Sequence, residues 1–234
     1  MSYAHKPLRK ISNAEFLHDV KKYIKNTHEF YKDKLPEMNI MAKRLYDEYT
    51  LTEFYRVFNK LWHASSGERS LAIHTLQLYQ NDFDLTTWHF IRGRLEGVKS
   101  LDEVMWMGEI IGAMYTKDPS IKRGILQLSD QKNQWMRRVA FFCFYNLFKR
   151  KEIKEVSLFL RIIEKNITDN DETMQKKMGS MLCEIGKIKK DALKRFILNH
   201  KTMSDVLFLE ATSGMQYLRK IKTLKKLNNP ISRR

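Results

Sequence analysis

The chain has 234 residues, with 43 Lys and Arg against 27 Asp and Glu, which gives a formal net charge of +16. Only 9 residues are Gly and 4 are Pro, too few for the tight turns of a β-sandwich or a Rossmann sheet. A hydrophobic content of 43% argues against wholesale disorder, and two cysteines exclude a disulfide scaffold or a four-cysteine zinc site. These values predict a soluble, basic, helical protein.

The excess positive charge lies almost entirely in one half of the chain. Residues 117–234 carry 27 basic and 12 acidic side chains, whereas residues 1–116 carry 16 and 15. Such asymmetry costs self-repulsion and is tolerated where an anionic partner is met, most commonly a nucleic acid. The start of the chain has no apolar signal core, and no apolar run is long enough for a membrane span. We therefore expect a cytoplasmic protein, nucleoid-associated if bacterial, with no membrane contact.

Helix signals recur along the chain with short connections between them. Three capping boxes mark helix starts, in chain order Ser12 with Glu15, Thr50 with Glu53, and Ser100 with Glu103. Pro36 suits a first helical turn, and further N-caps are expected at Asp84, Asp118 and Asn133. Other helices are expected over 68–79, 85–97, 152–165, 170–186, 189–199, 204–211 and 214–227.

This pattern predicts an all-α protein of roughly twelve helices. Their spacing favours a HEAT-like α-solenoid of about six antiparallel helix pairs, and a compact orthogonal bundle is the alternative. We expect one domain over residues 1–234, with 228–234 as a flexible basic tail. A curved stack of helices would present a basic concave face to a duplex.

The segment Asn133-Gln134-Trp135-Met136-Arg137-Arg138-Val139-Ala140 is the most informative. Trp135 and Arg138 are three residues apart and therefore neighbours on one helix face. We expect an arginine of this first turn to contact phosphate; stacking of the arginine on tryptophan for packing alone is the other interpretation. The remaining candidate DNA-binding residues are Lys176 and Lys177, together with Arg92, Arg94 and Lys99.

Catalytic signals are sparse. The chain has no Gly-rich phosphate loop, no HExxH motif and no His/Cys set with metal-ligand spacing, so we expect no cofactor and no metal. Asp102 and Glu103 are adjacent carboxylates at a predicted helix start, where capping and the helix dipole explain them without chemistry. Cys143 lies in an apolar helix and is expected to be buried and inert.

Four segments together resemble the DNA alkylation-repair family of the AlkC and AlkD type, over about residues 15–220. They are Leu61–Ala72, Ser100–Val104, Asn133–Ala140 and Gly179–Lys187. The resemblance implies an all-helical HEAT-like solenoid that holds double-stranded DNA on a concave basic face. It also implies a monofunctional glycosylase that excises cationic alkylpurines, with tryptophans on the lesion's sugar and an aspartate that stabilises the developing oxocarbenium charge.

The family's tryptophan-aspartate-x-valine-aspartate stretch falls on Leu101 to Met105, which places Met105 at the usual catalytic aspartate and Leu101 at a tryptophan. The later lesion-facing tryptophan falls near Ser180, whereas the family's arginine is retained as Arg138. A shift of one helical turn would instead bring a carboxylate to the cleft, with Trp106 as the aromatic residue. The carboxylates that this shift offers are Asp102, Glu103 and Glu109.

Three functions follow from these residues. We prefer a monomeric DNA-binding protein that grips duplex phosphates, on damaged or distorted DNA, with weak or absent 3-methyladenine and 7-methylguanine glycosylase activity. An active alkylpurine glycosylase that uses a displaced carboxylate such as Asp102 or Glu103 is the second. A helical-repeat scaffold whose basic face meets an acidic protein is the third.

Overall fold

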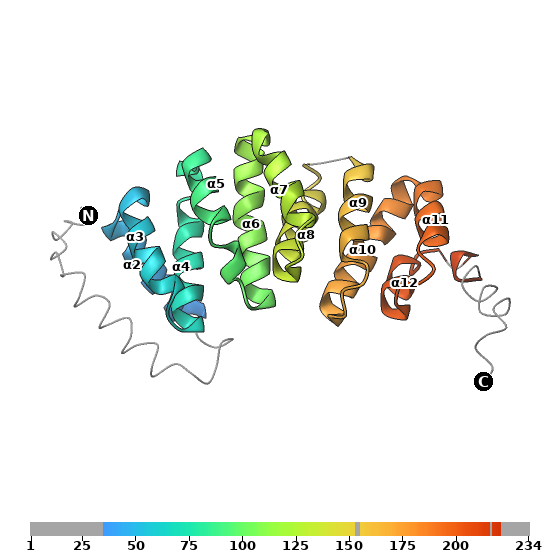
Figure 1. Ribbon diagram of the computed structural model, residues 1–234, viewed down its shortest axis with the longest axis horizontal. Helices are drawn as coiled ribbons and strands as arrows, with labels where there is room; N and C mark the ends of the chain where they lie inside the picture. The colour runs from blue at the N-terminus through green and yellow to red at the C-terminus, as the bar shows by residue number, and fades with distance from the viewer. Residues whose placement is uncertain (1–34, 153–154, 216, 221–234) are drawn as a thin grey trace, which may run out of the picture. The chain divides into compact units, whose positions relative to one another are not determined.

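The structure is a computed structural model that describes residues 35–152, 155–215 and 217–220. All regular elements in these ranges are helices, as Figure 1 shows. None of the described helices combines the length and apolar character that a membrane crossing requires. The capping box predicted at Ser12 and the basic tail predicted at 228–234 lie outside the described residues.

The chain divides into two compact units, one ending at Phe83 and the other beginning at Asp84. The assignment of residues 1–234 to one domain stays a prediction. In the first unit, α2 (Leu35–Glu48), α3 (Leu51–Trp62) and α4 (Ser66–Leu78) pack on one another and are followed by a short 3-10 turn, Gln80–Asp82.

The predicted cap of α3 is present in the first unit. The Thr50 backbone N–H donates to Glu53 Oε2 at 3.0 Å, and the Glu53 N–H donates back to Thr50 Oγ1. The helix expected from 68 begins at Ser66, where Glu68 accepts the Ser65 N–H at 2.8 Å. The apolar face of α3 packs inward, and Phe54 and Phe58 on this face are fully buried.

The second unit contains the remaining helices. They are α5 (Leu85–Arg92), α6 (Leu101–Lys117), α7 (Lys122–Ser129), α8 (Gln134–Lys149), α9 (Val156–Asn166), α10 (Glu172–Ile188), α11 (Lys190–Asn199) and α12 (Asp205–Ala211), with 3-10 turns at Leu95–Gly97 and Pro119–Ile121. Two boundaries differ from expectation by more than two residues: the helix predicted over 85–97 ends at Arg92 with Gly93 as its C-cap, and the one predicted from 152 begins at Val156. Residues 217–220 are helical, and the rest of the helix predicted to 227 lies outside the described residues.

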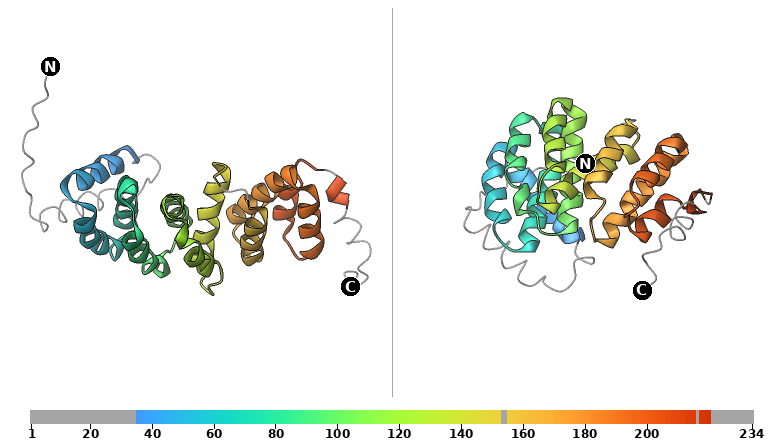
Figure 2. Two further views of the ribbon diagram at one scale, coloured as in Figure 1. Left: turned by 90° about the horizontal axis from the view of Figure 1, so that it is seen from above. Right: turned by 45° about the vertical axis from the view of Figure 1, so that its right-hand side comes forward.

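Alternate helices lie side by side in the second unit, α6 with α8 and α10 with α12, while the helices between them pack on their chain neighbours (Figures 1 and 2). Each of the two contacts contains a glycine. A Cβ at Gly108 of α6 would lie 2.7 Å from Phe142 Cβ, and one at Gly179 of α10 would lie 2.9 Å from the Leu207 carbonyl oxygen. The absence of a side chain therefore permits the close approach of the backbones, a packing pattern typical of stacked helical hairpins.

Candidate nucleic-acid interface

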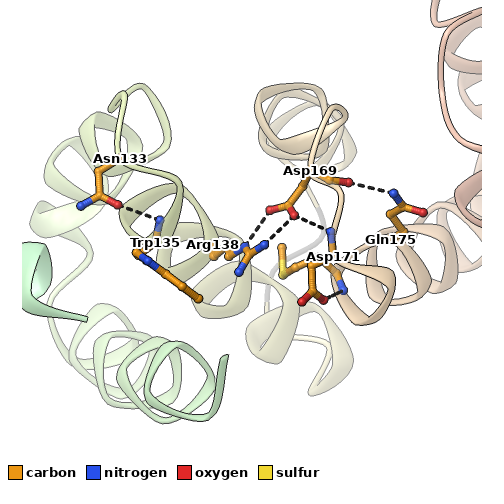
Figure 3. Close-up of polar contacts among 7 residues, drawn as sticks. Asn133, Trp135, Arg138, Asp169, Asp171 and Gln175 are labelled. Atoms are coloured by element: carbon orange, nitrogen blue, oxygen red, sulfur yellow. Dashed lines mark hydrogen bonds and ion pairs between the residues drawn. The ribbon is translucent and has the colours of Figure 1, made fainter. Parts of the chain in front are cut away.

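The first turn of α8 positions the tryptophan and arginine that the sequence singled out. Asn133 is the N-cap, and its Oδ1 accepts the Trp135 N–H at 2.9 Å. The helix then brings Arg138 onto the face of Trp135, with the guanidinium carbon 4.6 Å from a ring centroid. Figure 3 shows the two side chains at the same end of the helix.

Arg138 is paired with a carboxylate that the sequence analysis did not identify. Its Nε donates to Asp169 Oδ2 and its Nη2 donates to Asp169 Oδ1, each at 2.7 Å (Figure 3). The Arg138 and Asp169 side chains are only 6% and 2% exposed. The two parallel hydrogen bonds of such a bidentate pair fix the relative orientation of both groups. Arg138 therefore points inward, where Asp169 accepts from two of its five N–H donors, and does not project freely from the first turn of α8 as expected.

The turn that carries Asp169 is itself anchored by hydrogen bonds. The Asp171 N–H donates to Asp169 Oδ1 at 3.0 Å, and Gln175 Nε2 donates to the Asp169 carbonyl oxygen at 2.9 Å. Asp171 caps α10, and Ser204, the N-cap of α12, donates to Gln175 Oε1 at 2.8 Å. A continuous polar network thus runs from α8 through this turn to α10 and α12.

Burial and charge act in opposite directions on the Asp169–Arg138 pair. Burial alone would raise the pKa of the Asp169 carboxyl, but the hydrogen bonds from Arg138 and the Asp171 N–H, with the positive charges of Arg138 and Arg137, hold that pKa below its ordinary value. The hydrogen bond and charge of Asp169 raise the pKa of Arg138 against the effect of burial. Both groups stay ionised, so the charge of Arg138 is already compensated within the protein.

Arg137 also makes contacts within the protein. Its Nη1 donates to the carbonyl oxygens of Gln131 and Lys132 at 2.9 and 2.6 Å, in the connection that precedes α8. The side chain is half-buried and stabilises that connection. For Trp135, Arg137 and Arg138 alike, the contact with DNA stays a prediction.

The basic cluster of the α5–α6 region separates into two kinds of side chain. Arg94 stacks on Phe90, with its guanidinium carbon 3.5 Å from the ring centroid, and donates to the Phe90 carbonyl oxygen; burial lowers its pKa. Arg92 is exposed and donates to Gln127 Oε1 at 3.1 Å, and Lys99 is exposed before α6. Only Arg92 and Lys99 of the three present their side chains mainly to solvent.

The two candidate acids at the start of α6 have different surroundings. Glu103 is 4% exposed, and its Oε2 accepts the Lys99 N–H at 2.8 Å while its own N–H donates to Ser100 Oγ. The Glu103 carboxylate therefore stabilises the N-terminus of α6. Asp102 is exposed, and Met105 is half-buried one turn further on.

The two adjacent lysines in the first half of α10 also have different surroundings. Lys176 is exposed and forms an ion pair with Glu172 one turn before it, at 2.6 Å. Lys177 is half-buried, and its ammonium nitrogen lies 5.6 Å from the ring centroid of Tyr145 on α8. Tyr145 and Lys149, which lies over the same ring at 6.0 Å, were missed in the sequence; their one-turn spacing on α8 was the available signal.

The fold and these contacts define an all-α, solenoid-like protein whose second unit is strongly basic. A family model described as DNA alkylation repair enzyme matches residues 4–215, and the chain belongs to this family. A solved structure described as a predicted DNA alkylation repair enzyme from Enterococcus faecalis matches with a TM-score of 0.63 and 17% identity, over 89% of this chain and 98% of that chain. The comparison with curated proteins gives no match.

These comparisons confirm two predictions, the family resemblance and the all-α solenoid-like fold class. The identity of 17% to the Enterococcus protein supports the fold alone. Family membership gives the chain a role related to DNA repair.

Proposed function

We propose that the chain binds double-stranded DNA through its phosphates, as a monomer, with weak or absent alkylpurine glycosylase activity. The cations of the second unit supply the affinity, and the shape of the duplex or an exposed lesion supplies the selectivity. The proposal rests on the family, on the charge distribution and on the contacts of the individual side chains.

The main observation behind the proposal is that many basic side chains have no acidic partner. Residues 117–234 hold 27 basic and 12 acidic side chains. Twelve of the cations form no ion pair within the described part of the chain: Arg123, Lys132, Arg137, Lys149, Lys151, Lys177, Lys189, Lys190, Lys194, Arg195, Lys201 and Lys220. Unneutralised surface cations release the counterions of DNA when they meet its phosphates, which favours binding.

The acid required for glycosidic bond cleavage is missing from its expected position. Departure of a cationic purine leaves positive charge at the anomeric carbon, and a nearby carboxylate stabilises that charge. By the resemblance to the family's motif, Met105 stands at the corresponding position, and it has no charge to offer. Glu103 is committed to the Lys99 N–H, and Asp169 is neutralised by Arg138. These three environments support weak or absent activity.

Two measurements on the full chain test the proposal. Fluorescence anisotropy with a labelled duplex is expected to show tight binding at low salt and a steep loss of affinity as salt is added. Incubation with methylated DNA is expected to release 7-methylguanine and 3-methyladenine at or near the uncatalysed rate. Affinity that is flat with salt would remove the DNA-binding role. Efficient release that Asp102→Asn abolishes would establish a displaced catalytic acid instead.

A further inference from the structure

Tyr145 of α8 has two lysines over its ring, from different helices. Lys149, on the next turn of α8, has its ammonium nitrogen 6.0 Å from the ring centroid, and Lys177 of α10 has its nitrogen at 5.6 Å. The ring also packs against Phe141 and Phe142, whose centroids lie 5.6 and 5.9 Å from its own. Two cations from different helices therefore lie close to one buried ring.

Neither lysine has an acidic partner in the part of the chain that the structure describes. This contrasts with Lys122, Lys165, Lys176 and Lys187, each of which forms an ion pair with a carboxylate. Attraction to the ring compensates part of the repulsion between the two ammonium groups. The position of Lys149 in the last turn of α8 suits the helix dipole, but that explanation does not apply to Lys177 on another helix.

The Tyr145 hydroxyl is a third hydrogen-bond donor beside the ammonium groups of Lys149 and Lys177. It has no hydrogen-bond partner among the described residues, and it is not one of their buried unpaired polar atoms, so it reaches solvent. Tyr145 as a whole is only 8% exposed, so the hydroxyl is the main part of this side chain that a ligand can contact. The two ammonium groups and the hydroxyl are each donors of the kind that binds phosphate oxygens.

We infer that Lys149, Lys177 and the Tyr145 hydroxyl form a binding site for backbone phosphate of DNA, which we call the Tyr145 site. The inference rests on the proposed DNA-binding function and assigns it a place between α8 and α10. The lysines of this site have no ion pair within the protein, so their charge is available to a DNA phosphate. The charge of Arg138, in contrast, is compensated by Asp169. The contact is to phosphate and carries no base specificity.

The test compares variants of equal charge in the full chain. Lys149→Gln with Lys177→Gln removes the Tyr145 site, whereas Lys122→Gln with Lys187→Gln removes two lysines that are paired with Glu155 and Glu184. The affinity for one labelled duplex is measured across a salt series, with thermal unfolding as a check that each variant is folded. The magnitude of the slope of log affinity against log salt is expected to fall by about 2 in the first variant and by much less in the control.

Each outcome bears on the inference. A slope unchanged in the Lys149→Gln, Lys177→Gln variant, while the wild type binds with steep salt dependence, would overturn the Tyr145 site and leave the proposed function intact. An equal fall in both variants would also overturn it, because the contribution would then be diffuse charge. Absence of binding by the wild type would overturn the proposed function and this site together. Tyr145→Phe is expected to weaken binding with little change in the slope, since it removes a donor and no charge.

Discussion

The guanidinium of Arg138 and the carboxylate of Asp169 are joined by two hydrogen bonds of 2.7 Å, although the residues lie 31 positions apart in the sequence. The pair fastens α8 to the turn that leads into α10, and the network continues through Gln175 to Ser204 at the start of α12. Its position makes Arg138 a structural residue of the second unit, whatever part it has in DNA binding.

Removal of one member of this pair is expected to destabilise the protein strongly. Asp169→Ala leaves a buried guanidinium without its partner, which costs about 3–5 kcal/mol in the free energy of unfolding. Denaturant unfolding followed by circular dichroism measures the change. Glu184→Gln, which breaks the exposed pair with Lys187, is the control and should cost no more than about 1 kcal/mol.

The double variant Arg138→Met with Asp169→Leu separates the penalty for an unpaired charge from the value of the pair. An apolar pair of similar volume removes both buried charges, so it is expected to be clearly more stable than Asp169→Ala. A double variant as unstable as the single one would show that the hydrogen bonds themselves, and not the uncompensated charge, account for the loss.

Stability is expected to fall at acidic pH through Asp169. The pKa of this carboxyl is held below its ordinary value of 3.8 in the folded state, so the unfolded chain takes up the proton first as the pH falls. The contribution of Asp169 is therefore fully present above about pH 4 and is lost as the pH drops through the lower folded-state value. Urea midpoints of the wild type and Asp169→Asn should converge below pH 4. A gap between them that stays constant would contradict this assignment.

The glycine between α6 and α8 is expected to resist substitution. A Cβ at Gly108 would lie 2.7 Å from Phe142 Cβ and 2.9 Å from the Cys143 backbone nitrogen, so Gly108→Ala forces the two helices apart and should cost about 1–3 kcal/mol. The matched control is Gly93→Ala, where the nearest atom would be 3.8 Å away and φ is −67°. That change should be neutral or stabilise by up to about 1 kcal/mol. Thermal midpoints distinguish the two.

Cys143 is expected to react with thiol reagents only after unfolding. Its side chain is fully buried in α8, and burial raises the pKa of the thiol well above its ordinary value, so little thiolate exists and none is accessible. Mass spectrometry after iodoacetamide treatment should find Cys143 unmodified in the native protein and alkylated in urea. Rapid labelling of the native protein would show that this helix opens readily.

Much of the local structure could be predicted because its causes are local. The caps at Thr50, Asp84, Ser100 and Asn133 depend on side chains that reach only two or three residues along the chain, and all four begin helices in the structure. Helix ends were less predictable. The 85–97 segment ends early at Gly93, where apolar periodicity alone favoured continuation.

By itself, the sequence determined the all-α class, the family and the concentration of positive charge in the second half, since composition, periodicity and short motifs are properties of the chain. Only the tertiary structure decided which charges are paired. Asp169 meets Arg138 across a separation of 31 residues, and Lys177 reaches Tyr145 from another helix. Such pairings depend on how helices pack in space, and because an ion pair compensates a charge, packing decided which cations remain available to a phosphate.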